Sequence, residues 1–169
     1  TIKSDLNRLS NYKIDCVFLP SNIEMYPNGI NTSNYNNSLF NILEGKSRPG
    51  FFKGVTTIVA KLFDIIKPTH AFFGKKDFQQ LCIINKLVSD LQYPIQIIPC
   101  PIIREKNGLA MSSRNKYLTE HEFSVAATIF KALEYGRTLL KNNELSCKKL
   151  KNQIIKIINN EPQLKIDYV

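Results

Sequence analysis

The chain has 169 residues, of which 43% are hydrophobic and 22% charged, so it can bury a core and is not a disordered tail. No apolar run approaches the roughly 20 residues that a membrane helix needs, and the first residues are unlike a signal peptide; we expect a cytoplasmic protein without a membrane partner. The net charge of +9 comes from 18 lysines and only 5 arginines, whereas nucleic-acid readers rely on arginine, so we expect no nucleic-acid partner. A basic pocket for a small polyphosphate is the better interpretation of this positive charge. A basic RNA-binding domain, whose affinity for RNA would fall steeply with salt, is a further alternative.

The first third of the chain carries signals for short elements. Residues 4–9 are typical of the end of a short helix, and the apolar run 15–19 predicts a buried strand. A helical turn is expected at 21–24 and a chain turn at 26–29, while 44–50 is expected to be a loop.

The middle of the chain alternates strands and helices. An apolar stripe with helical spacing predicts a helix over 55–66, followed by a strand at 71–73 and a tight turn at 74–77. A second amphipathic helix over 78–91, with Phe78 among its inward residues, leads to a strand at 95–98. This alternation predicts an α/β fold with a parallel, helix-covered sheet.

The last third is predicted to be helical. Thr119 and Glu122 have the spacing of a capping box for a long helix that runs to about residue 141, and a further helix carries Leu150, Ile154 and Ile158. No crossover strand follows either helix. We therefore expect a domain boundary near Ile103.

This boundary would separate residues 1–103 from residues 104–169. The chain does not begin with methionine, and its last four residues are typical of a strand just begun. We therefore expect an interior piece of a longer protein. Four cysteines, at positions 16, 82, 100 and 147, form no C-x-x-C pair, and we interpret them as small buried hydrophobes.

The turn at 74–77 is the first candidate site, because ligands of parallel sheets bind at the carboxyl ends of the strands. Gly74 would let a ligand approach the backbone closely, and Lys76 carries a mobile charge suited to a phosphate. The alternative is that Asp77 only caps the following helix and that the lysines are solvated.

Three further groups of residues could bind anions or hydroxyl groups. Residues 111–115 (MSSRN) bring together two hydroxyls, a guanidinium and an amide, although they could equally form an ordinary polar loop. Arg48 lies beside Pro49 and Gly50 in what is either an anion-binding turn or a surface loop. Gln79 and Gln80, in the first turn of the second helix, could hydrogen-bond a hydroxylated substrate.

Taken together and in order, these segments resemble the pantothenate synthetase (pantoate–β-alanine ligase) family. The resemblance runs without obvious gaps from residue 1 to about residue 118 and more loosely to residue 169. It rests on the segments YPNG (26–29), LEG (43–45), RPG (48–50), FKGV (52–55), KLF (61–63), FGKKDFQQL (73–81) and GLAMSSRNKYL (108–118).

The resemblance implies a Rossmann-like parallel sheet with helices on both faces, of the nucleotidyltransferase superfamily, followed by part of a smaller α+β C-terminal domain. It implies an AMP-forming ligase: ATP and pantoate form a pantoyl-adenylate with Mg²⁺, and β-alanine then displaces AMP. It also implies a homodimer.

Site residues follow from the resemblance position by position. Those expected to bind ATP are Gly74, Lys75, Lys76, Asp77, Ile103, Met111, Ser112, Ser113 and Arg114. Lys75 stands where many members have an acid, and Ile103 matches a backbone contact to the adenine. Those expected to act in catalysis are Lys76, Ser112, Ser113 and Arg114. Gln80, Phe73 and Arg48 are expected to contact the substrate, and Asp5 corresponds to a position near the Mg²⁺ site.

Two departures from the family pattern stand out. Phe51 occupies a position where members commonly have histidine, so we expect weaker substrate handling or a local compensation. The family's His-x-Gly-His motif lies upstream of residue 1, and we expect this chain alone to be inactive. The alternative function is a non-catalytic nucleotide- or anion-binding remnant of such an enzyme.

Overall fold

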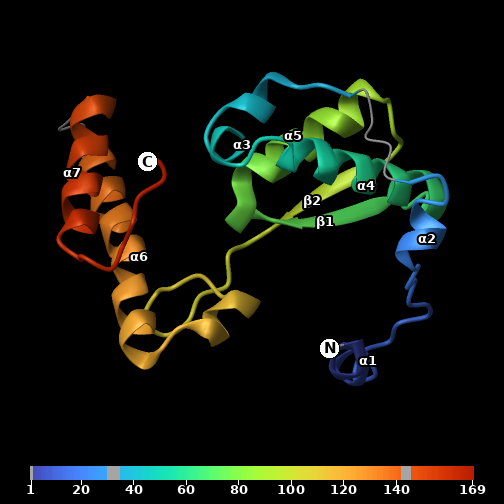
Figure 1. Cartoon of the computed structure of the whole chain (residues 1–169), viewed down its shortest axis with the longest axis horizontal. Coiled ribbons are helices and arrows are strands. Elements are labelled where there is room, and N and C mark those ends of the chain that lie inside the picture. The colour runs from blue at the N-terminus through green and yellow to red at the C-terminus, as the bar shows by residue number, and fades with distance from the viewer. Residues whose placement is uncertain (1, 30–34, 142–145) are drawn as a thin grey trace. The chain divides into compact units, whose positions relative to one another are not determined.

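The computed structural model describes residues 2–29, 35–141 and 146–169 (Figure 1). Contacts along the chain divide it into two compact units, residues 1–33 and residues 34–169, and each is described by itself. The domain boundary expected near Ile103 stays a prediction.

The first unit contains α1 (Ile2–Leu9) and α2 (Asn22–Met25). A capping box starts α2: Ser21 N–H donates to Glu24 Oε2 at 2.7 Å, and Glu24 N–H donates to Ser21 Oγ at 3.3 Å. The predicted buried strand at 15–19 is wrong, because this segment is irregular and Leu19 is 58% exposed. A strand needs a neighbour to pair with its main-chain groups, and none of the described residues pairs with this segment.

The second unit is built on a parallel β–α–β arrangement preceded by a helix. The helix α4 (Phe51–Ile66) leads to β1 (His70–Gly74), the 3₁₀ turn η2 (Lys75–Asp77), α5 (Phe78–Asp90) and β2 (Gln96–Cys100). The two strands pair in parallel. The predicted order of these elements and their parallel pairing are confirmed.

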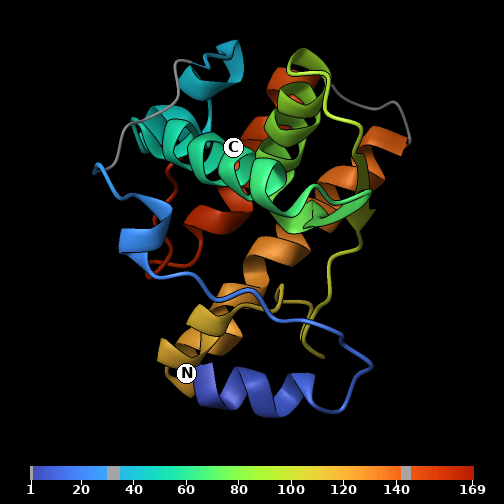
Figure 2. The same cartoon turned by 90° about the vertical axis from the view of Figure 1, so that its right-hand side faces the viewer.

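The core of this layer lies between the two helices and one face of the sheet. Phe63 of α4 packs with Ile84 and Leu87 of α5, while Phe73 and Ile97 of the strands contact the same cluster. Both views show α4 and α5 over the same side of the strands (Figure 1, Figure 2). The opposite face carries Phe72, which is 69% exposed, so helices on both faces stay a prediction.

The segment expected to be a loop at 44–50 contains a helical turn instead. The 3₁₀ turn η1 (Ser38–Asn41) is followed by α3 (Glu44–Ser47). Leu43 turns the chain into α3 with φ 47° and ψ −122°, a conformation that side chains disfavour. A Cβ on Gly45 would lie 2.1 Å from the carbonyl oxygen of Phe40, so only glycine fits this close approach. The loop prediction is wrong because this helical turn depends on main-chain packing, which the hydrophobic periodicity of the sequence does not reveal.

Two predictions about burial are also wrong. Phe78 does not point into the core: it begins α5 and is 62% exposed. None of the four cysteines is fully buried, since Cys16 and Cys147 are exposed while Cys82 and Cys100 are half-buried. An apolar sequence neighbourhood does not reveal which side of a segment a small side chain occupies.

Residues 104–141 and 146–169 contain a short bridge and two packed helices. Arg104 pairs with Ala110, and the 3₁₀ turn η3 (Ser113–Tyr117) precedes α6 (Glu120–Lys141) and α7 (Cys147–Asn159). The predicted capping box is confirmed at the start of α6. The two helices pack closely at Gly136, where a Cβ would lie 2.7 Å from Ile154 Cδ1. None of the helices in the described ranges is long and apolar enough to cross a membrane.

Candidate functional site

A cavity of about 760 Å³ lies at the carboxyl end of β1. Its walls come from η1, α3, the start of α4, η2, the start of α5, η3 and the C-terminal segment. The polar and charged lining residues are Glu44, Arg48, Lys76, Asp77, Gln79, Gln80, Arg114 and Tyr168. The larger apolar lining residues are Leu39, Ile42, Leu43, Phe51, Phe52 and Phe78. The cavity therefore joins a cationic, hydrogen-bonding part to an apolar part.

The turn after β1 supplies one cation of the cavity. Lys76 Nζ lies 3.4 Å from Asp77 Oδ1, in an exposed ion pair that contributes little to stability. Asp77 makes no side-chain cap to α5, so the alternative interpretation of Asp77 as a helix cap is not supported. Gly74 has φ −72°, and a Cβ there would meet only Lys76 N at 4.0 Å. The fold itself does not require glycine at this position, which leaves room for a ligand.

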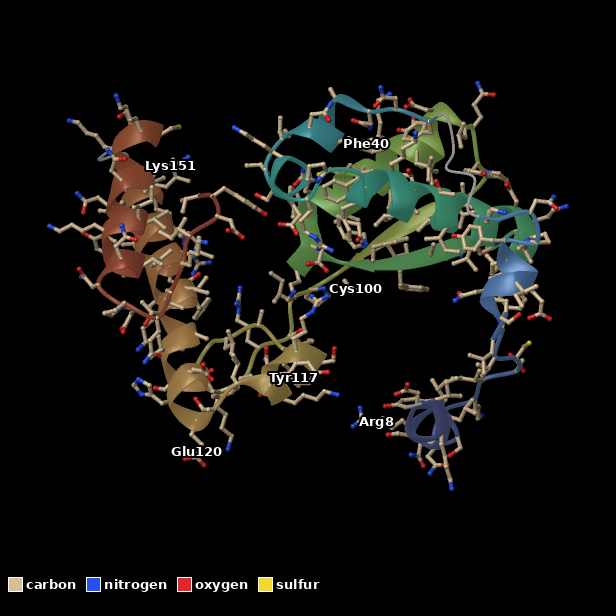
Figure 3. All side chains as sticks on the ribbon, in the orientation of Figure 1. Arg8, Phe40, Cys100, Tyr117, Glu120 and Lys151 are labelled. Carbon is tan, nitrogen blue, oxygen red and sulfur yellow. The ribbon has the colours of Figure 1, made fainter. Side chains whose placement is uncertain are left out.

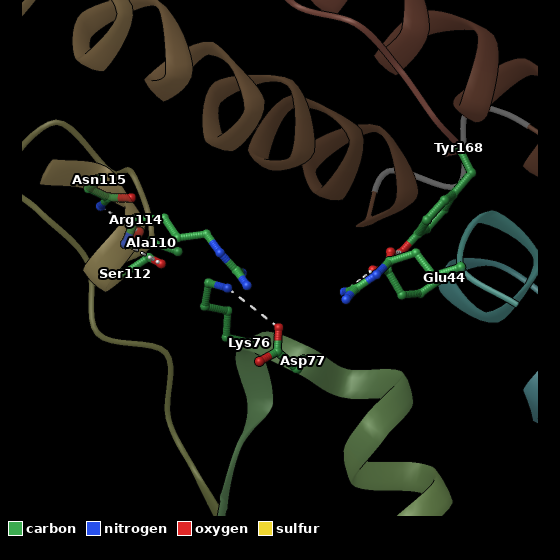
Figure 4. Close-up of polar contacts among 9 residues, drawn as sticks. Glu44, Lys76, Asp77, Ala110, Ser112, Arg114, Asn115 and Tyr168 are labelled. Carbon is green, nitrogen blue, oxygen red and sulfur yellow. Dashed lines mark hydrogen bonds and ion pairs between the residues drawn. The ribbon is translucent and has the colours of Figure 1, made fainter. Parts of the chain in front are cut away.

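Arg114 supplies a second cation from another part of the chain. Its side chain extends toward Lys76 in the close-up (Figure 4). It makes no ion pair with any residue in the described part of the chain. Ser112 caps η3 by accepting a hydrogen bond from Arg114 N–H at 3.2 Å, and Asn115 Nδ2 donates to the carbonyl of Ala110 at 3.1 Å. These bonds fix the main chain that carries the guanidinium.

The third cation, Arg48, is held by two neighbours. Its Nη1 lies 3.2 Å from Glu44 Oε1, and its Cζ lies 3.9 Å from the ring centroid of Phe51. Tyr168 OH donates to Glu44 Oε2 at 3.4 Å (Figure 4). Burial, and then the negative charge of Glu44, raise the pKa of Tyr168, so this hydroxyl stays protonated at neutral pH. Glu44 thus connects an arginine of the cavity with the C-terminal segment.

The two adjacent glutamines have different surroundings. Gln79 Nε2 donates to the carbonyls of Leu39 and Ile42, both at 2.8 Å, and Gln79 Oε1 accepts from Glu44 N–H at 3.1 Å. All these bonds go to the main chain of the cavity wall, so Gln79 is a structural residue. Gln80 lines the same cavity and is half-buried.

Several predicted site residues lie outside the cavity lining. Met111 N–H donates to the carbonyl of Ile103 at 2.9 Å, and the side chains of both residues are exposed. Phe73 packs in the core between sheet and helices. The other predicted residues that do not line the cavity are Gly74, Lys75, Ser112 and Ser113. Asp5 lies on α1 in the separate first unit.

The sequence did not identify Glu44, Phe78 and Tyr168 as residues that line the cavity. Glu44 lies in the segment expected to be a loop, and the helical spacing of Phe78 predicts a core position instead. Tyr168 is distant in sequence from every motif, and only the fold brings it to Glu44. No local pattern in the sequence could have found it.

The carboxylates of the cavity do not fit a resident metal ion. Glu44 is ion-paired with Arg48, and Asp77 is ion-paired with Lys76. Within residues 2–29, 35–141 and 146–169, no three histidine, cysteine or carboxylate side chains gather as a metal-binding group. The Mg²⁺ position expected near Asp5 stays a prediction, because Asp5 belongs to the first unit and the cavity to the second.

A parallel β–α–β unit with a cavity at the carboxyl end of its first strand is typical of the class of Rossmann-like α/β proteins. Within that class, the chain belongs to the pantoate-beta-alanine ligase family, whose family model matches residues 1–169.

Curated relatives and solved structures agree with this family. The pantothenate synthetase of Acetivibrio thermocellus is 46% identical over 168 residues, which are 99% of this chain and 60% of that protein. The crystal structure of pantothenate synthetase from Thermus thermophilus matches 99% of this chain and 61% of its own with a TM-score of 0.93 and 34% identity. A Francisella tularensis pantoate-beta-alanine ligase, complexed with beta-gamma ATP and beta-alanine, matches 93% of this chain and 58% of its own with a TM-score of 0.76 and 36% identity. The chain thus spans about 60% of the length of these relatives.

Proposed function

We propose that this chain is part of an ATP-dependent ligase that joins pantoate and β-alanine through a pantoyl-adenylate, with release of AMP, in pantothenate biosynthesis. The observation that carries the proposal is the convergence of Lys76, Arg114 and Arg48 on one cavity at the carboxyl end of β1. Membership of the family and the nucleotide-bound relative from Francisella tularensis support it.

The chemistry needs positive charge where the leaving group develops negative charge. A carboxylate oxygen of pantoate attacks the α-phosphorus of ATP, the bond to the pyrophosphate oxygen breaks, and pyrophosphate leaves. Lys76 and Arg114 both line the cavity, and we propose that their positive charges neutralise the charge of the leaving pyrophosphate. The amine of β-alanine then attacks the acyl carbon of the adenylate, loses a proton, and AMP departs.

The apolar part of the cavity suits the organic substrate. Pantoate has a branched, dimethylated carbon skeleton as well as a carboxylate and hydroxyls. Phe78 and Leu43 offer exposed hydrocarbon beside Gln80, whose amide can hydrogen-bond a hydroxyl. We propose that Gln80, with Arg48, binds pantoate.

Further roles are proposed from the resemblance alone. Ser112 and Ser113 would donate hydrogen bonds to the phosphates after a movement of their loop, and Gly74, Lys75, Asp77, Ile103 and Met111 would contact ATP. Mg²⁺ would arrive with the nucleotide phosphates rather than in a protein cage. We further propose that the whole enzyme is a cytoplasmic homodimer, which light scattering of the purified enzyme would test.

The decisive test is ATP–pyrophosphate exchange by the full-length enzyme in the presence of pantoate. Lys76→Ala is expected to slow exchange roughly 10²–10³-fold, by analogy with the loss of one preorganised donor. Lys151→Ala is the matched control, because Lys151 is an exposed lysine of α7 that does not line the cavity. Near-normal exchange by Lys76→Ala with an unchanged circular dichroism spectrum would contradict the proposed mechanism.

A second experiment separates the enzyme from a non-catalytic remnant. The present chain is expected to bind ATP without turnover, and the coding region upstream is expected to encode a His-x-Gly-His motif that restores turnover. A remnant predicts nucleotide binding by both the short and the extended chain and turnover by neither.

A further inference from the structure

We propose that Phe51 is a positioning residue: its ring holds the guanidinium of Arg48 at the cavity, ready to bind the oxyanion of a substrate. The inference rests on the proposed function, because the oxyanion is either a carboxylate or a phosphate of the proposed substrates. Phe51 would act through Arg48, because its own ring carries no hydrogen-bond donor.

The contact geometry leaves the arginine with donors to spare. Arg48 Cζ lies over the ring of Phe51, 3.9 Å from the ring centroid. Arg48 Nη1 donates a hydrogen bond to Glu44 Oε1 at 3.2 Å. Because a guanidinium has five N–H donors, this pairing leaves donors for a second oxyanion. The cation–π contact thus sets the orientation without occupying a donor.

The ring of Phe51 is itself well supported. It stands at the first position of α4 and packs on Phe52 with ring centroids 5.1 Å apart. Phe52 is only 2% exposed and stacks in turn on Phe40 with centroids 6.3 Å apart. Phe40 belongs to η1 and is labelled in Figure 3. Arg48 is 50% exposed in its side chain and would otherwise sample many rotamers. A fixed aromatic surface therefore reduces the ordering cost that binding would incur.

Glu44 alone would not have the same effect. An ion pair between partly exposed side chains is weak in water, and an incoming oxyanion competes with Glu44 for the same guanidinium. When that competition loosens the Glu44 contact, the ring of Phe51 still restrains the arginine. The expected signature is therefore a change in substrate affinity rather than in the rate of the chemical step.

The test uses the full-length enzyme with Phe51→Leu, Phe51→Tyr, Arg48→Ala and the double variant Arg48→Ala/Phe51→Leu. Calorimetry with ATP, pantoate and inorganic pyrophosphate as separate probes shows whether the oxyanion is a phosphate or a carboxylate. Phe51→Leu is expected to weaken binding of the Arg48-dependent probe roughly three- to tenfold and to raise its KM with kcat nearly unchanged. Phe51→Tyr, which keeps the ring, is expected to restore both values.

The double variant decides between positioning and general structural support. In the Arg48→Ala background, Phe51→Leu is expected to cause no further loss of affinity. The inference is overturned if Phe51→Leu leaves all three affinities unchanged, if it weakens them equally in both backgrounds, or if Arg48→Ala weakens none of them. Failure of the proposed function would appear instead as absence of ATP–pyrophosphate exchange in the wild-type enzyme; binding of inorganic pyrophosphate would still test the role of Phe51.

Discussion

The side-chain oxygen of Gln79 accepts a hydrogen bond from the main-chain N–H of Glu44 at 3.1 Å, which ties the start of α5 to the start of α3. The amide nitrogen of the same glutamine donates to the carbonyls of Leu39 and Ile42. One side chain thus satisfies three main-chain groups of a cavity wall that has little regular structure of its own.

Replacement of Gln79 by leucine should therefore destabilise the fold. The variant leaves main-chain groups without partners, and we expect a loss of about 1–3 kcal/mol in the free energy of unfolding. Urea denaturation of Gln79→Leu measures the loss. Gln80→Leu is the matched control, and we expect it to reduce pantoate affinity while stability changes little. Equal stability losses in the two variants would contradict the distinction.

Gly45 should tolerate no side chain. The added methyl of Gly45→Ala would lie 2.1 Å from the Phe40 carbonyl oxygen and 3.2 Å from a ring carbon of Phe52. We expect a loss of about 1–3 kcal/mol, since main chain must shift. In Gly54→Ala, by contrast, the methyl meets nothing within 4 Å in the first half of α4, and a gain of about 0.5–1 kcal/mol is expected. Thermal melting of the two variants measures the expected loss of stability in Gly45→Ala and the expected gain in Gly54→Ala.

Tyr93 should make stability depend on pH in alkaline solution. Burial first, and then the hydrogen bond of its hydroxyl to Asp64 Oδ1 at 2.8 Å, raise the pKa of Tyr93 to about 12. Because the pKa is higher in the folded than in the unfolded chain, the contribution is fully present below about pH 10 and is lost as the pH rises toward about 12.

Unfolding of the wild type and of Tyr93→Phe across this pH range tests whether the contribution of Tyr93 to stability is lost as the pH rises. The wild type should lose stability more steeply than Tyr93→Phe, which has no phenol at this position to ionise. Parallel stability curves for the two proteins would rule out the raised pKa.

The start of α6 should depend on its capping box. Thr119 Oγ1 accepts from Glu122 N–H at 3.2 Å, so Thr119→Ala is expected to cost about 1 kcal/mol. Thr138→Ala, inside the same helix and exposed, removes only a bond to the Glu134 carbonyl and should leave stability unchanged or slightly higher. Chemical denaturation compares the two. A Thr119 variant as stable as the Thr138 variant would show that the box contributes nothing.

Helices and strands with a clear local hydrophobic periodicity could be predicted from the sequence. The apolar stripe of α4 and the strand–turn–helix sequence around Gly74 predict the correct elements in the correct order. The segment 15–19 has the composition of a strand, yet pairing is a property of two segments, and composition describes only one. The helical turn α3 could not be predicted, because it depends on Leu43 and on the missing side chain of Gly45.

The candidate site was predictable to a similar extent. Motif resemblance led to Lys76, Arg114, Arg48 and Gln80, all of which line one cavity. It could not lead to Tyr168, whose contact with Glu44 spans 124 residues of sequence. Nor could it show that Gln79 is engaged by the cavity wall, because neighbouring glutamines look alike until their partners are known.

The positive φ of Leu43 has a consequence for how this protein unfolds. A leucine at φ 47° costs on the order of 1–2 kcal/mol, and Gln79 fastens the peptide groups on both sides of it. Amide protons of residues 42–45 should consequently exchange with solvent deuterium through a local opening, well before those of Leu87 or Ile97. The ligand pocket would then be lost as a separate, earlier event than global unfolding.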